Sequence, residues 1–210
     1  MGGLQSKLLF QTYKLKEEAL KILLAISITL LTLLSGCATK EQFQAGLNDI
    51  DAHWGKTNAK ILAEKGIRTF PACQQKCLLA AKNATMELGF SIEKESSNSL
   101  TGKASGPTPF TEDEYKEIRA VEEPMMQAAA ADHVGGFWSS FFKLQSGKSW
   151  VIIDVYVSPN GTSKTDVRVS FRIQQKEVNP NIIVGNNAPS EAVRKGLDKW
   201  WSAFDKNMRP

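Results

Sequence analysis

The stretch SWVIIDVYVSPNGTSKTDVRVSFRIQQ, residues 149–175, decides the fold. Apolar and polar residues alternate on both sides of PNGTSK, a segment made almost entirely of turn-forming residues. One face of the first half carries Val151, Ile153, Val155 and Val157, and one face of the second half carries Val167, Val169, Phe171 and Ile173. A period of two is typical of strands that bury one face. We therefore predict two antiparallel strands joined by a turn.

Moving outward from this hairpin, the sequence FSIEKESSNSLTGKAS, residues 90–105, predicts a second one around the turn at 96–98. A short extended segment over 67–70 and a helix over 71–88 precede it, with Gly89 as the residue that ends the helix. The chain closes with a helix that begins at Ser190. Its apolar face carries Val193, Leu197, Trp200, Trp201 and Phe204.

Residues 106–147 separate the two hairpins and predict a helical excursion. Thr111 and Glu114 have the spacing of a capping box. Pro124 is expected to interrupt the helix or to begin its second half, and Gly135-Gly136 to end it. The order of elements predicts an α+β fold, in which an antiparallel sheet is covered by helices in a two-layer arrangement.

This layout resembles the helix-grip domains of lipoproteins that accompany the outer-membrane barrel-assembly machine. In those domains too, a helix leads into a strand with a Leu-Gly-Phe-x-Ile pattern, which here is Leu88-Gly89-Phe90-Ser91-Ile92. The resemblance implies a helix-grip-like sandwich. The excursion over 106–147 has no counterpart in the simple pattern.

Near the N-terminus, the segment KILLAISITLLTLLSGCATK, residues 21–40, combines a lysine-flanked apolar run with a small-residue end. The apolar run from Ile22 to Leu34 has about 13 residues, whereas a helix needs roughly 20 to cross a bilayer. A run of this length behind a positively charged segment is typical of a secretory signal.

Leu34-Ser35-Gly36-Cys37 resembles the lipobox of bacterial lipoproteins. The resemblance implies that diacylglycerol is attached to the Cys37 thiol, that residues 1–36 are removed as a signal peptide, and that the new amino terminus is acylated, for example with palmitate. Ala38 rather than Asp follows Cys37, which by resemblance to enterobacterial sorting rules implies the outer membrane, facing the periplasm. Several acyl chains make such anchoring stable.

The remaining chain divides into residues 37–65, a tether or short helix, and residues 66–210, the α+β domain. Phe43, Leu47, Ile50 and Trp54 would form one stripe of the short helix. Without residues 1–36, the chain keeps 22 Lys and Arg against 20 Asp and Glu. This balance argues against a nucleic-acid partner, which would require a clustered basic surface.

Two cysteines remain after Cys37. Cys73 and Cys77 lie four residues apart on the stripe of the predicted helix over 71–88. An oxidising compartment favours a disulfide, but this spacing is near the limit of disulfide geometry, so a disulfide and two buried thiols both stay open. Neither His53 nor His133 has ligand spacing to another His or Cys, and we predict no metal and no cofactor.

No catalytic motif stands out, and we predict that the chain is not an enzyme. Asp154, an acid within an apolar strand, is expected to pair with Arg168 or Arg172 across the hairpin. The aromatic segment Phe137, Trp138, Phe141 and Phe142 either closes the end of the sandwich or docks on a partner protein or the bilayer.

The expected function is that of a non-enzymatic binding or scaffold lipoprotein for an envelope partner. The alternative is a carrier of a small hydrophobic ligand or lipid. Its cavity would lie between the sheet and the C-terminal helix, among Phe171, Ile173 and the Trp200-Trp201 pair.

Overall fold

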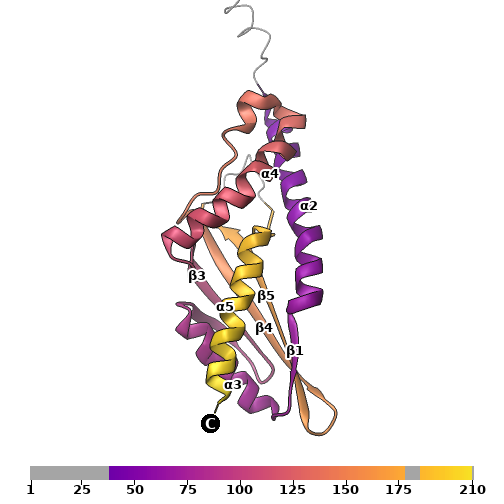
Figure 1. Cartoon of the computed structure of the whole chain (residues 1–210), viewed down its shortest axis with the longest axis vertical. Helices are drawn as coiled ribbons and strands as arrows, with labels where there is room; N and C mark the ends of the chain where they lie inside the picture. The colour runs from indigo at the N-terminus through magenta and orange to yellow at the C-terminus, as the bar shows by residue number, and fades with distance from the viewer. Residues whose placement is uncertain (1–37, 178–184, 210) are drawn as a thin grey trace, which may run out of the picture. The chain divides into compact units, whose positions relative to one another are not determined.

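Five strands form one sheet in the order β1-β5-β4-β3-β2, and every neighbouring pair is antiparallel (Figure 1). The computed structural model describes residues 38–177 and 185–209 of the chain. The strands are β1 (Ile67–Phe70), β2 (Ser91–Glu95), β3 (Ser99–Ser105), β4 (Ser149–Asn160) and β5 (Lys164–Gln175). Helices pack on this sheet, so the predicted α+β class is confirmed. The predicted signal peptide and Cys37 lie outside the described residues.

The predicted central hairpin is confirmed. β4 and β5 pair without a break from Ser149 opposite Gln175 to Asn160 opposite Lys164. Gly161 occupies the turn with φ of 73°, a conformation that favours glycine. The valine rows of both strands are buried on one face, as their alternation predicts. β2 and β3 form the second hairpin, and β3 joins the sheet by pairing with β4.

Helix α3 (Gln74–Glu87) covers the buried face through small side chains, Cys77, Ala80, Ala81 and Ala84. Gly102 of β3 lies beneath it, where an added Cβ would come within 2.7 Å of the Thr85 methyl and 2.8 Å of an Ile153 methyl. The absence of a side chain at Gly102 therefore leaves room for the Thr85 and Ile153 side chains between α3 and the sheet.

The cysteine prediction needs a correction. Helix α3 begins at Gln74 rather than at Pro71, so Cys73 is its N-cap residue and is exposed, while Cys77 is fully buried. Both are free thiols, and no disulfide joins them. Burial raises the pKa of the Cys77 thiol, which favours the unreactive protonated form.

Helix α5 (Ser190–Met208) fills the other half of the same face. Trp200, Trp201 and Phe204 are exposed by 1% or less. The Trp200 indole donates to the Thr85 hydroxyl at 3.1 Å, and the Trp201 indole donates to the Lys65 carbonyl at 2.7 Å. Buried tryptophans need such acceptors, and here the acceptors connect α5 to α3 and to the end of α2.

Residues 40–65, for which the sequence left open a tether or a short helix, form one helix, α2 (Lys40–Lys65). It packs against α4 (Glu112–Ser139) and α5, and the compact unit of the chain accordingly begins at Thr39 rather than at residue 66. The predicted stripe explains this packing, since Ile50 and Trp54 are buried.

Helix α4 is the predicted excursion, and its start has the predicted capping box between Thr111 and Glu114. The helix runs through Pro124, so the expectation of an interruption there was wrong. The non-helical backbone lies instead at Gly135, with φ of 78°. After this kink, one further turn leads to Ser139.

Candidate functional site

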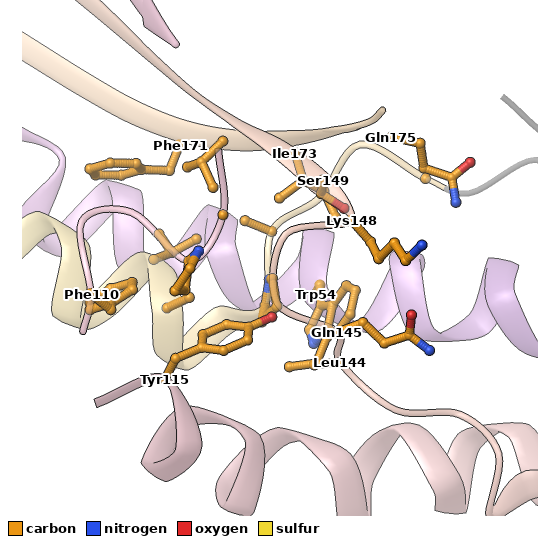
Figure 2. Close-up of a pocket in the computed structure, with 18 of the residues that line it drawn as sticks. Trp54, Phe110, Tyr115, Leu144, Gln145, Lys148, Ser149, Phe171, Ile173 and Gln175 are labelled. Atoms are coloured by element: carbon orange, nitrogen blue, oxygen red, sulfur yellow. The ribbon is translucent and has the colours of Figure 1, made fainter. Parts of the chain in front are cut away.

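A partly open pocket of about 270 Å³ lies where α2, α4 and α5 meet the end of the sheet. Such a volume is near the lower end for small-molecule sites. Figure 2 shows its lining, and the labelled aromatic and aliphatic members are Trp54, Phe110, Tyr115, Leu144, Phe171 and Ile173. They come from five separate parts of the chain, so only the folded domain brings them together.

Two loops form one wall of the pocket and are joined by backbone hydrogen bonds. One loop, 106–111, connects β3 to α4, and the other, 140–148, connects α4 to β4. The amide of Gly106 donates to the Ser149 carbonyl at 2.9 Å, and the amide of Gly147 donates to the Gly106 carbonyl at 3.1 Å. These bonds fix the two loops relative to the end of the sheet.

Polar side chains border one side of the pocket. Figure 2 shows the polar ends of Gln145, Lys148 and Gln175 on one side, with Phe110 and Phe171 at the opposite end. The site thus combines an apolar interior with amide and ammonium groups at its edge. This arrangement suits an apolar group whose polar or anionic end stays near solvent.

A buried carboxylate stabilises the helices around the pocket. Glu122 of α4 is only 5% exposed. It accepts hydrogen bonds from the Trp54 indole at 2.8 Å and from the Glu191 amide at 2.5 Å. It therefore holds α2 and the N-terminus of α5 in place, where a negative charge also suits the helix dipole.

The sequence analysis did not predict this role of Glu122 and instead expected Ser190 to cap the last helix. The N-cap of α5 is Pro189, and the Ser190 hydroxyl is buried without a hydrogen-bond partner. A signal was present, because α4 buries one residue at every fourth position. Glu122 is the acid in that row, between Ile118 and Met126, with Ala130 and Val134 following.

The Asp154 prediction is confirmed. Its carboxylate accepts from the Arg172 guanidinium at 2.9 Å and from the Thr101 hydroxyl at 2.8 Å. Both contacts run across neighbouring strands on the face opposite the valines. Asp154 therefore has a structural role in the sheet.

Five aromatic side chains gather where the start of α2 meets the end of α4, and we call this group the aromatic tip: Phe43, Phe137, Trp138, Phe141 and Phe142. Phe137 and Phe141 are 66% and 61% exposed. Phe142, predicted as a docking residue, is only 7% exposed and stacks on Phe43 with ring centroids 5.6 Å apart. Phe142 therefore supports the tip from inside and is not available as a docking residue, whereas Phe137 and Phe141 are exposed.

Two further properties concern the described residues alone. None of their His, Cys, Asp and Glu side chains gather into a group of three or more that could hold a metal ion. Across 38–177 and 185–209, every helix is too short or too polar to span a bilayer.

Comparison of the chain with family models, curated proteins and solved structures finds no match.

Proposed function

We propose that this chain is a bacterial lipoprotein, anchored through Cys37 to the periplasmic face of the outer membrane, whose domain is a non-enzymatic binding module for an envelope partner. The observation that carries the binding role is the partly open apolar pocket between α2, α4, α5 and the end of the sheet. The partner would place an apolar side chain or short apolar segment in this pocket.

The position of α2 supports close attachment to the membrane. This helix begins at Lys40, three residues after Cys37, and it belongs to the compact unit. A chain acylated at Cys37 would therefore hold the domain near the lipid surface without a long tether. A partner in the same membrane would meet the domain at a high local concentration.

The environment of the acids supports a binding role over acid-base chemistry. Glu122 and Asp154 both accept two hydrogen bonds from neighbouring protein groups. Glu114 accepts from the Thr111 amide and from Lys199. Each carboxylate is thus occupied by a contact that stabilises the fold.

The test fills the pocket with a side chain of the protein itself. Ala192 lines the pocket from the first turn of α5, so Ala192→Trp would occupy the space that a partner needs. The matched control is Ala120→Trp, which places the same ring on an exposed position of α4. A stoichiometric partner should be recovered from solubilised envelopes with the wild type and the control and lost with Ala192→Trp. Equal recovery with all three would refute recognition through the pocket.

The pocket also favours a second candidate function, the transport of a small hydrophobic ligand or lipid. Phe171 and Ile173 line the pocket, as this hypothesis requires, but Trp200 and Trp201 are packed in the core elsewhere along α5. Trp54 is the tryptophan that lines the pocket. Native mass spectrometry with lipid extracts should then show a bound species, and Trp54 fluorescence should change; Trp54→Phe is the control. No bound species would exclude the carrier.

A further inference from the structure

The outer part of the aromatic tip, exposed Phe137 and Phe141 together with half-buried Trp138, is one continuous apolar patch. The rings of Phe137 and Phe141 lie 5.6 Å apart, and each contacts Trp138, at 5.3 Å and 5.8 Å. Single exposed apolar residues are ordinary on protein surfaces, whereas a contiguous group marks a surface that contacts something else.

The patch is held in a fixed shape. Trp138 packs edge-on against Phe43 of α2 at 6.0 Å, and Phe142 stacks on the same Phe43. The hydroxyl of Ser139 donates to the Gly136 carbonyl at 2.9 Å, which stabilises the turn that carries the rings. The aromatic side chains are therefore presented by a supported turn, and their exposure is not the result of a loose end.

The position of the patch indicates what covers it. Phe43 lies in the first turn of α2, and Figure 1 shows the start of α2 beside the end of α4. Two residues, Ala38 and Thr39, separate Cys37 from Lys40, so the chain takes three Cα–Cα steps between them. A fully extended chain spans at most about 3.6 Å per residue, so roughly 11 Å separates an acylated Cys37 from this helix start at most. The short chain keeps the start of α2 close to the acyl chains, and the contact between Trp138 and Phe43 keeps the patch close to the start of α2.

We infer that Phe137, Trp138 and Phe141 insert into the interfacial region of the bilayer beside the acylated Cys37. Phenylalanine and tryptophan are the side chains that amphipathic elements bury at this depth. The acyl chains then supply attachment, and the patch supplies a second contact that fixes the orientation of the domain. The inference rests on the proposed lipoprotein identity, because it requires the acyl anchor.

The experiment uses the full chain, purified after export and reconstituted into vesicles of phosphatidylethanolamine and phosphatidylglycerol. The readout is quenching of tryptophan fluorescence by lipids with brominated acyl chains. The wild type should be quenched, and Trp138→Phe should remove most of the quenching, because Trp138 is the tryptophan in the patch. The double variant F137S/F141S should lose more than half of it, since Trp138 then has no apolar neighbours to carry it into the lipid.

A matched control comes from two other exposed apolar residues. Leu79 on α3 and Val121 on α4 are 59% and 61% exposed, comparable with the two phenylalanines. The double variant L79S/V121S should keep the quenching of the wild type. Thermal melts followed by circular dichroism should show that both double variants stay folded, since all four positions are at the surface.

The mass of the N-terminal peptide separates failure of the inference from failure of the proposed function. An unmodified Cys37 would overturn the lipoprotein proposal and this inference with it. An acylated Cys37 without quenching, or with quenching that Trp138→Phe leaves intact, would overturn the bilayer contact alone. In that case the patch would instead be a surface for a protein partner.

Discussion

The two ends of the domain use aromatic residues in opposite ways. Where α5 crosses α3, Trp200, Trp201 and Phe204 are exposed by 1% or less and fill the space against the sheet. Where α2 meets the end of α4, Phe137 and Phe141 are more than 60% exposed. The pocket lies with α2 and α4 as well. The aromatic residues of α5 therefore stabilise the fold, whereas those at the end of α4 leave apolar surface exposed to solvent.

The largest expected effect follows from truncating the packed end. Trp200→Ala would remove a fully buried ring and leave the Thr85 hydroxyl without its indole partner. Urea denaturation should show a loss of about 3–5 kcal/mol in the free energy of unfolding. Phe141→Ala, at the aromatic tip, should change it by less than about 0.5 kcal/mol. Similar losses for the two variants would contradict the assignment of stability to the buried aromatic residues of α5.

The second prediction concerns the polar contacts that support the pocket. Glu122→Ala would leave the Trp54 indole and the Glu191 amide without their acceptor. A buried donor without an acceptor costs about 1–3 kcal/mol, and the Glu191 amide is only part-buried, so the free energy of unfolding should fall by roughly 2–4 kcal/mol. Glu122→Gln keeps one acceptor oxygen, enough for one of the two donors, and should lose less than Glu122→Ala. If alanine and glutamine cost the same in urea denaturation, the carboxylate does not hold the helices as described.

The third prediction compares two glycines. At Gly102 an added methyl would lie within 3 Å of Thr85 and Ile153 side chains, whereas at Gly136 nothing lies within 4 Å of the same methyl. Gly102→Ala should therefore destabilise the domain by about 1–3 kcal/mol through overpacking. Gly136→Ala should be close to neutral. Urea denaturation of both variants and the wild type measures the two effects. A neutral Gly102→Ala would mean that α3 can move away from the sheet without cost.

Several features of the fold could be predicted from the sequence, because the information for them is local. The alternation in β4 and β5 and the capping box at Thr111 each depend on residues that are neighbours along the chain. The alternation of the same hairpin predicted that Asp154 pairs with Arg168 or Arg172, and the structure shows Arg172 as the partner. The prediction failed locally at the start of α3, because Pro71 suits the first turn of a helix but the helix begins three residues later, at Gln74.

The site could be predicted only in part, because it depends on distant contacts. The pocket combines α2, two loops and the ends of β5 and α5, and no local pattern states that these meet. The aromatic segment was visible as composition, but its division into buried Phe142 and exposed Phe137 depends on Phe43, more than ninety residues away. The role of Glu122 likewise depends on Trp54 and Glu191, which belong to two other helices.

The smallest expected effect concerns the ion pair between α4 and α5. Lys199 donates to Glu114 at 2.7 Å, and this contact, together with the Thr111 amide, holds the pKa of the Glu114 carboxyl below its ordinary value. A carboxyl whose folded-state pKa is depressed stabilises the fold above its unfolded pKa of about 4.3, and this contribution is lost as the pH falls through the folded pKa. Both side chains are about one-third exposed, so the contribution should stay below about 1 kcal/mol.

Glu114→Gln should therefore lower the free energy of unfolding slightly at pH 7, and the difference from the wild type should shrink as the pH falls below about 4. Lys199→Met removes the same ion pair from the other side. In a double-mutant cycle, the coupling between the two positions should be measurable at pH 7 and smaller at pH 3. A coupling that persists unchanged at pH 3 would show that contacts other than the charge on Glu114 join α4 to α5 at this point.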